Sequence, residues 1–382
     1  MRVPTPTKIW ERFFESMVLE YALETFLPPK RRGRPGRKFD RKDFEFFAPS
    51  VSELSDVFTQ DRKQSRLIHH YFDHPRFQSA YLLYFYPLHT FKFFTILSPF
   101  LSSLGSRSKA LTVIDLGAGP GTASLGLIQS LLHSGQQVPA LQLHWIDQNV
   151  KIMEHGRELI RRLYDSMPEN FAAAPDIRFH RGDLLRRPAG VPQADLILSG
   201  NFLNEASRNP LELMMKVLET SKAKHLLCVE PAIRFQAQSL SELRNHLLEL
   251  NQGWHAISPC LHDKVCPLSS GRDWCHSSQP VEIPGLWFLK FSEWLGSQRH
   301  FLKYSHLFVS KNPQAMDAKV RKSMLRVVSD PIETGKHKWK ILLCQPERTQ
   351  SQIIESVRRP QIYRGDVVKA SAVKSAQLSR FQ

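Results

Sequence analysis

Apolar runs of strand length alternate with longer segments of helical pattern through the middle of the chain. One intervening helix is predicted at about 149–164. Strands that alternate with helices predict a mostly parallel sheet with both faces covered, which is an α/β fold. The strand-like runs occupy residues 111–116, 141–147, 176–183, 194–200 and 225–231.

The regions on either side of this core have other patterns. Residues 8–27 predict an amphipathic helix that ends at Pro28 and Pro29, and residues 50–105 are also predicted to be helical. After the core, the runs HLFVSK, LRVVSDP and KWKILLC indicate further strands. The predicted divisions are an N-terminal helix and basic arm (1–49), a helical region (50–105), an α/β domain (106–310) with a cysteine-rich insertion at about 258–295, and a C-terminal segment (311–382).

Composition narrows the class of protein and its partners. No stretch approaches the roughly 20 apolar residues that a membrane-spanning helix requires, so no membrane partner is expected. The N-terminus lacks a continuous apolar segment and contains glutamates, which argues against a signal or transit peptide. We therefore expect a cytoplasmic protein of bacterial type that is monomeric when free, with a mitochondrial location less favoured. A reducing compartment argues against disulfides.

The charge balance favours a polyanionic partner. Lys and Arg number 52 against 36 Asp and Glu, a net charge of +16. Such an excess favours nucleic acid first and acidic membrane surfaces second, although a basic surface without any partner is the simpler alternative.

Much of this charge is gathered in the segment from Lys30 to Lys42. Its core, Arg-Gly-Arg-Pro, resembles an AT-hook that lays arginines in a narrow minor groove of DNA. The alternatives are a mobile arm that grips phosphates and a solvated linker. The candidate nucleic-acid-binding residues are Lys30, Arg31, Arg32, Arg34, Arg37 and Lys38.

A glycine-rich loop follows the first strand of the core. Glycines let the backbone approach a ligand closely, and the loop leads into a helix N-terminus. A dinucleotide fingerprint would need glycine where Thr122 stands, and a P-loop would need a lysine that is absent. An α/β core with ordinary turn glycines remains the structural alternative. The candidate loop residues are Asp115, Gly117, Ala118, Gly119 and Gly121.

The segment IDLGAGPGTA resembles the first motif of S-adenosylmethionine (SAM)-dependent methyltransferases. The resemblance implies that Asp147 holds the ribose hydroxyls, that Asp183 meets the adenine amine and that Asn201 faces the substrate. A ribose diol offers two donors to one carboxylate, which suits Asp147. Such a fold can also bind the cofactor without turning it over.

Three of the five cysteines, Cys260, Cys266 and Cys275, lie close together in an irregular segment. Their spacing lacks the tight pairs of structural zinc sites. A metal site would need a fourth ligand, for which Cys344, His262 and His276 are candidates, whereas Cys228 reads as a buried strand residue. Four thiolates would suit an iron–sulfur cluster; a catalytic thiol and no joint role are the alternatives.

The segments SPCLHDKVCPL and RDWCHSS resemble a family of methyltransferase-like proteins associated with the small ribosomal subunit, found in mitochondria and bacteria. Leu261 stands where members typically have proline. VEPAIRFQAQSLSELRNHLLE, YSHLFVSK and YRGDVV also match. The resemblance implies a class I Rossmann-like fold with a seven-stranded sheet. It also implies a [4Fe–4S] cluster, with zinc as the lesser alternative, and a role in small-subunit assembly through ribosomal RNA. The cluster ligands that it implies are Cys260, Cys266, Cys275 and Cys344.

Methyl transfer itself has no identifiable catalytic residue in this sequence. The Asn-Pro-Pro-Tyr type of motif is absent, and SGNFLNEA stands in its place. We therefore expect a SAM-binding assembly protein. The alternatives are an active methyltransferase for ribosomal RNA or a ribosomal protein, and a DNA-associated protein that uses the Arg-Gly-Arg-Pro arm.

Overall fold

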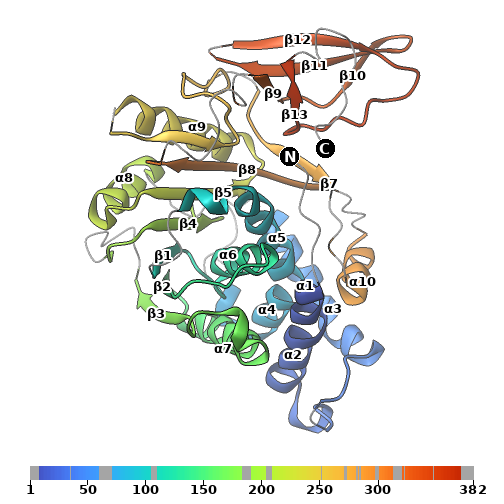
Figure 1. The fold of residues 1–382 in the computed structure, drawn as a ribbon. Coiled ribbons are helices and arrows are strands. Elements are labelled where there is room, and N and C mark those ends of the chain that lie inside the picture. Colours follow the sequence, from blue (N-terminus) through green and yellow to red (C-terminus); the bar gives the residue numbers. More distant parts are fainter. Residues whose placement is uncertain are drawn as a thin grey trace.

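The computed structural model arranges the chain as a central sheet with helices on both faces and a second, smaller sheet near the C-terminus (Figure 1). The structure describes residues 8–34, 36–59, 71–104, 110–182, 191–203, 209–250, 252–270, 273–280, 283, 285–296, 301–312, 321, 323–346 and 348–370.

The main sheet has seven strands in the order β3-β2-β1-β4-β5-β8-β6, with an additional strand, β7, paired to β8. Strands β1 to β5 are parallel, and β8 runs antiparallel to β5. The strand order reverses between β1 and β4, which places a ligand crevice at the carboxyl ends of these strands. The strands are β1 (Leu111–Leu116), β2 (Leu141–Asp147), β3 (Asp176–Arg181), β4 (Leu196–Gly200), β5 (His225–Pro231), β6 (His255–Ser258), β7 (Ser277–Pro280) and β8 (Phe301–Ser310).

Each face of the main sheet has its own apolar core because successive side chains of a strand point to opposite faces. On β1, Val113 joins the core formed with α6, α7 and the N-terminal helices. Ile114 and Leu116 join the core formed with α8 and α9. These helices are α6 (Thr122–His133), α7 (Val150–Ser166), α8 (Pro210–Ser221) and α9 (Arg234–Glu249).

The N-terminal helices pack through aromatic side chains. Trp10 is fully buried, and its ring lies 5.8 Å from Phe91 and 5.5 Å from Phe94. A π-helical turn at Phe13–Met17 joins α1 to α2, so the predicted helix at 8–27 is one continuous helical segment. The helices are α1 (Lys8–Arg12), α2 (Val18–Phe26), α3 (Arg41–Thr59), α4 (Pro75–Ala80), α5 (Tyr86–Leu97) and α10 (Leu286–Trp294).

The edge of the main sheet carries the cysteine-rich loop. β6 ends where Ser258 pairs with Phe308 of β8, and β7 begins where Ser277 pairs with Tyr304. Both ends of the intervening loop, residues 259–276, therefore stand on one strand. β7 is the extra strand within the predicted insertion.

The C-terminal segment forms a separate antiparallel sheet in the order β10-β11-β9-β13, with β12 also paired to β11. Ile341 and Leu343 of β11 face its own small core. Leu342 and Cys344 alternate with them and pack with Cys266 and Cys275. The strands are β9 (Met324–Val327), β10 (Ile332–Gly335), β11 (Lys338–Gln345), β12 (Arg348–Glu355) and β13 (Val367–Lys369).

Among the described residues, no helix is both long and apolar enough to cross a membrane.

Candidate functional site

The glycine loop joins β1 to α6 with left-handed backbone at three positions. Gly117, Gly119 and Gly121 have φ of +64°, +53° and +70°. A Cβ on Gly121 would lie 2.1 Å from the Trp145 ring, and one on Gly117 would lie 2.9 Å from Phe202. Glycine is therefore required both by conformation and by close approach.

Asp115, near the end of β1, is hydrogen-bonded to the first turn of α6, the helix that follows the glycine loop. Its Oδ2 accepts hydrogen bonds from the Ser124 amide (2.9 Å) and hydroxyl (2.8 Å). The Trp145 indole donates to the same hydroxyl at 2.9 Å. Burial raises the pKa of Asp115 to about 7. This carboxyl is 1% exposed, so it positions α6 and is closed off from the solvent side of the crevice.

Asp147, at the end of β2, holds the loop itself. Its Oδ2 accepts from the Gly119 amide at 2.8 Å and its Oδ1 from the Asn149 amide at 2.9 Å. Burial raises its pKa, against the lowering effect of these backbone hydrogen bonds. The Gln148 amide also contributes to holding this carboxylate. A carboxylate has about four lone-pair sites, so acceptor capacity remains for a ribose hydroxyl. Asp147 and the glycine loop thus fit a nucleoside cofactor.

Asn201 follows β4 at the same edge of the sheet. Its backbone has φ of +56°, and its amide donates to the Val229 carbonyl at 2.9 Å. Its side-chain Nδ2 lies 3.4 Å from His89 Nδ1, which is 3.2 Å from the Tyr81 hydroxyl. His89 could not be selected from the sequence, because it stands alone among the aromatic residues of α5. Ala118 is 2% exposed within the loop, and Asp183 lies outside the described residues.

The structure brings the cysteines of the edge loop together. Cys260, Cys266 and Cys275 line one small cavity between α9 and β8. The loop is tied to the sheet because Ser305 Oγ donates to the Cys275 carbonyl (3.0 Å) and Trp274 Nε1 donates to the Ala232 carbonyl (3.0 Å).

Cys344 reaches the same place from the second sheet. It packs with Cys266 and Cys275 and interacts electrostatically with all three loop cysteines. Cys228, by contrast, is fully buried in β5, as expected of a small apolar residue.

The two histidines considered as a fourth ligand have other neighbours. His262 Nε2 lies 3.6 Å from Cys344 Sγ, and its Nδ1 lies 3.2 Å from the Lys264 carbonyl. His276 Nδ1 lies 3.3 Å from Arg364 Nη1. Cys344 therefore packs with the loop cysteines, and of the two histidines only His262 lies beside its sulfur. Within the described ranges, no group of three or more His, Cys, Asp or Glu side chains is placed so that it could hold a metal ion.

The surroundings of Cys266, Cys275 and Cys344 favour the protonated thiol. Burial and, to a lesser extent, the neighbouring thiols raise the pKa of Cys266 to about 11 and that of Cys344 to about 12. Burial also raises the pKa of Cys275, although Arg326 and Arg364 oppose the shift. Such thiols are poor nucleophiles at neutral pH, which disfavours the catalytic-thiol alternative.

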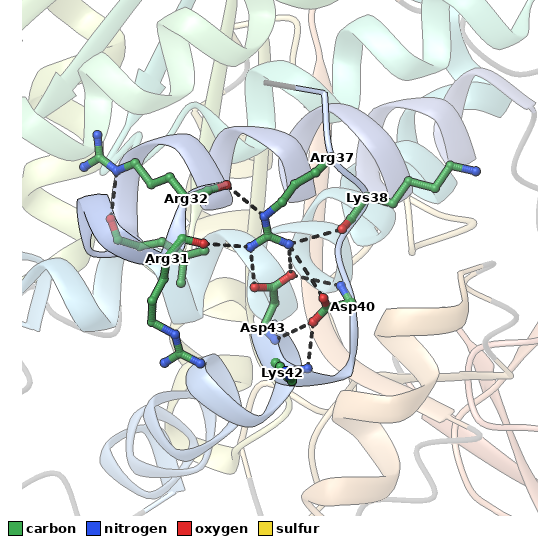
Figure 2. A network of polar contacts seen from close by, with 8 residues as sticks. Arg31, Arg32, Arg37, Lys38, Asp40, Lys42 and Asp43 are labelled. Carbon is green, nitrogen blue, oxygen red and sulfur yellow. Dashed lines mark hydrogen bonds and ion pairs between the residues drawn. The ribbon is translucent and has the colours of Figure 1, made fainter. Parts of the chain in front are cut away.

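The basic segment is folded against the start of α3, as Figure 2 shows. The Arg37 guanidinium donates to both carboxylate oxygens of Asp43 at 2.6 Å, and its Nε donates to the Arg32 carbonyl at 2.8 Å. Asp40 Oδ1 accepts from the Asp43 amide (3.1 Å) while Asp43 Oδ2 accepts from the Asp40 amide (2.9 Å). This reciprocal cap begins α3.

The predicted nucleic-acid residues therefore divide into two kinds. Arg37 is used internally, and Arg32 Nε donates to the Leu27 carbonyl at 2.8 Å. The described part of the segment is thus a capped loop rather than a free arm. Lys30, Arg31, Arg34 and Lys38 are exposed, as is Arg32, and Arg31 lies over the Phe46 ring at 5.0 Å.

The strand order, the glycine loop after β1 and the carboxylate after β2 define the class I fold of SAM-dependent methyltransferases. Among solved structures the chain is similar to the plantazolicin methyltransferase BpumL in complex with SAH (11% identity, TM-score 0.36, 71% of this chain and 98% of that chain). It is also similar to magnesium protoporphyrin IX methyltransferase (ChlM) from Synechocystis PCC 6803 with bound SAM (12% identity, TM-score 0.36, 68% of this chain and 96% of that chain). A third similar structure is that of a putative RNA methyltransferase, PH1948 from Pyrococcus horikoshii (12% identity, TM-score 0.32, 72% of this chain and 98% of that chain).

Residues 80–373 match the family described as mitochondrial small ribosomal subunit Rsm22. The match spans more than half of the chain, which therefore belongs to the Rsm22 family. Comparison with curated proteins gives no match. The predicted resemblance to small-subunit proteins with a methyltransferase-like fold is confirmed. The family's description names the mitochondrial compartment, which the sequence ranked second, whereas the iron–sulfur centre remains a prediction.

Proposed function

We propose that this chain binds SAM and an iron–sulfur cluster and acts in small-subunit assembly by contacting ribosomal RNA. The proposal assigns no methyl acceptor to the protein. The observation that carries it is the convergence of Cys344 on Cys260, Cys266 and Cys275. The three loop cysteines are close in sequence, whereas Cys344 comes from the second sheet, about 70 residues further along the chain.

The thiols suit an iron–sulfur group because thiolate is the ligand that such clusters use. Cys260, Cys266, Cys275 and Cys344 would hold a [4Fe–4S] cluster. When bound, the cluster would supply metal–thiolate bonds that contribute to the free energy of folding. In the part of the small sheet that the structure describes, the apolar core has six buried side chains, so such a crosslink would stabilise its position.

The cofactor and RNA surfaces lie elsewhere on the chain. Asp147 would accept hydrogen bonds from ribose hydroxyls beside the glycine loop, whose Cβ-free backbone admits the nucleoside. Lys30, Arg34 and Lys38, with the net charge of +16, support a contact with the phosphates of ribosomal RNA.

Anaerobic purification followed by iron and sulfide analysis and a visible spectrum tests the cluster. The proposal predicts brown protein with iron and sulfide in about equal amounts. Colourless, iron-free protein with stoichiometric zinc would replace the cluster with the zinc alternative.

A competent methyltransferase is the second candidate, favoured by the polar group that Asn201, His89 and Tyr81 form beside the glycine loop. Transfer of labelled methyl groups from SAM to a small-subunit precursor would establish it. Absence of transfer to any ribosomal RNA or protein, together with measurable SAM binding, supports the assembly role.

The DNA-associated alternative has less support. Arg32 and Arg37 make backbone and carboxylate contacts within the loop, so their guanidinium groups are partly occupied. Deletion of residues 28–42 separates the two roles: loss of binding to A/T-rich duplex with ribosome association intact would favour DNA.

A further inference from the structure

Three buried arginines lie near the cysteines: Arg244 lines the cavity, and Arg326 and Arg364 act on the Cys275 thiol. Arg244 of α9 is 2% exposed, Arg326 of β9 is 5% exposed, and Arg364, which precedes β13, is 9% exposed. They come from the main domain and from the second sheet. Arginine is almost never buried to this extent unless it is paired.

Arg244 contacts the thiol site directly. Its Nε donates to Cys260 Sγ at 3.1 Å, and its Nη2 donates to the His262 carbonyl at 2.6 Å. Its Nη1 donates to Asn245 Oδ1 at 2.8 Å, which also accepts from the Cys266 amide at 3.1 Å. One guanidinium therefore orients two cysteines.

Arg326 and Arg364 hold the other end of the loop. Arg326 Nη2 donates to Ser277 Oγ at 2.9 Å, and β11 places Cys344 directly opposite Arg326. Arg364 Nη1 donates to the Trp274 carbonyl at 3.0 Å. The Nε atoms of both arginines are buried and have no hydrogen-bond partner in the described part of the chain.

These cations have little negative charge to balance them. Arg364 reaches Asp273 at 3.7 Å, whereas no ion pair of Arg244 or Arg326 with a carboxylate is found among the described residues. Burying a cation without a counter-charge costs several kcal/mol. Neutral thiols cannot supply that charge, but a centre of four thiolates can.

We propose that Arg244, Arg326 and Arg364 form a cation shell that balances the thiolate centre, and that Arg244 is a positioning residue that makes this centre easier to reduce. The inference rests on the proposed function. Positive charge and an N–H···S hydrogen bond favour the more negative state of a cluster. Reduction adds one electron from an external reductant, and no proton or ligand moves.

The test compares Arg244→Gln and Arg244→Lys with Arg321→Gln in the full chain. Arg321 is a matched control because it donates to the Leu261 carbonyl (3.3 Å) and pairs with Asp263 (3.1 Å) in the same loop, without a sulfur contact. Anaerobic titration with dithionite measures the midpoint potential. It should fall in Arg244→Gln, fall less in Arg244→Lys, which keeps the charge, and stay unchanged in Arg321→Gln.

A second measurement separates a cation shell from ordinary packing. Arg244→Gln should lower the melting temperature of the iron-loaded protein. It should lower it less, or raise it, after iron is removed by a chelator, because the stripped site leaves the cation unbalanced. Equal losses in both forms, or an unchanged potential in iron-loaded Arg244→Gln, would overturn the inference alone. Iron-free wild-type protein would overturn the proposed function, and this inference with it.

Discussion

Two carboxylates at neighbouring strand ends have different tasks in the crevice. Asp115 is bonded to Ser124 at the start of α6, whereas Asp147 is bonded to Gly119 in the loop itself. Both were selected from the sequence because each ends a strand before a turn. Which of them faces the loop depends on side-chain direction, which only the folded chain determines.

Replacing Asp147 by Asn should weaken SAM binding about tenfold or more, because hydrogen bonds to a charged group contribute about 1.5–3 kcal/mol. Isothermal titration calorimetry with SAM measures the change. Asp195→Asn is the matched control, since Asp195 accepts from the Thr112 amide (3.0 Å) at the opposite end of β1. Equal losses in the two variants would show a general effect on the sheet.

His225 predicts a loss of stability in acid. Burial lowers its pKa to about 4 from its ordinary value of 6.5. Below pH 6.5 the His225 imidazole binds a proton in the unfolded chain but stays neutral in the folded chain. The free energy of unfolding therefore falls between about pH 6.5 and pH 4. Urea unfolding should show that wild type loses about 2 kcal/mol more than His225→Gln between about pH 7.5 and pH 5. Identical losses would remove His225 as the cause.

At the scale of elements, β1, β2, β4 and β5 could be predicted from their apolar runs, β3 from its alternation of apolar and polar residues, and α7 from its amphipathic pattern. β12 could not, since Arg348–Glu355 is mostly exposed and polar, and β13 has only three residues. The loop cysteines were visible as a group. Arg244 was not, because a lone arginine on an amphipathic helix usually faces solvent, and only the folded cysteine loop buries it.

Replacing Gly156 in α7 by alanine should change the free energy of unfolding in the direction opposite to that usual for a helix. Alanine normally stabilises a helix by about 1 kcal/mol relative to glycine. Here its Cβ would lie 2.1 Å from the Pro120 carbonyl oxygen of the glycine loop. Gly156→Ala should therefore destabilise the protein by about 1–3 kcal/mol in urea unfolding. Gly182→Ala, where nothing lies within 4 Å, is the control. A stabilised Gly156→Ala would refute this packing.

Two neighbouring residues of the basic loop should affect different properties: Arg37 the stability of the fold, and Lys38 the binding of RNA. Arg37→Gln should cost about 1–3 kcal/mol in unfolding because it leaves Asp43, which is 4% exposed, without its partner. Lys38→Gln should leave stability within about 0.5 kcal/mol. It should weaken RNA binding and reduce the salt slope by about 1. Fluorescence anisotropy with a small-subunit RNA fragment, repeated at several salt concentrations, measures the affinity and the salt slope. An unchanged slope in Lys38→Gln would remove this residue from the interface.

At the scale of the whole molecule, a methyltransferase-like domain and a small antiparallel sheet meet at the cysteine-rich loop. The strands before and after the loop, β6 and β7, both pair with β8. Cys344 of β11 faces the loop together with Leu342, because alternate side chains of a strand share a face. Leu268 and Val328 add a small apolar contact there. A centre bound to all four cysteines would join the sheets by bonds rather than by buried area.

Iron and sulfide content of Cys344→Ser, purified without oxygen beside wild type and Cys228→Ser, tests this joining most directly. Cys228 is the matched control because it is buried in β5 and does not line the cavity of the loop cysteines. Cys344→Ser should lose most of its iron and become about as unstable as Cys266→Ser, while Cys228→Ser keeps its iron. Full iron and sulfide in Cys344→Ser would contradict a centre shared between the two sheets.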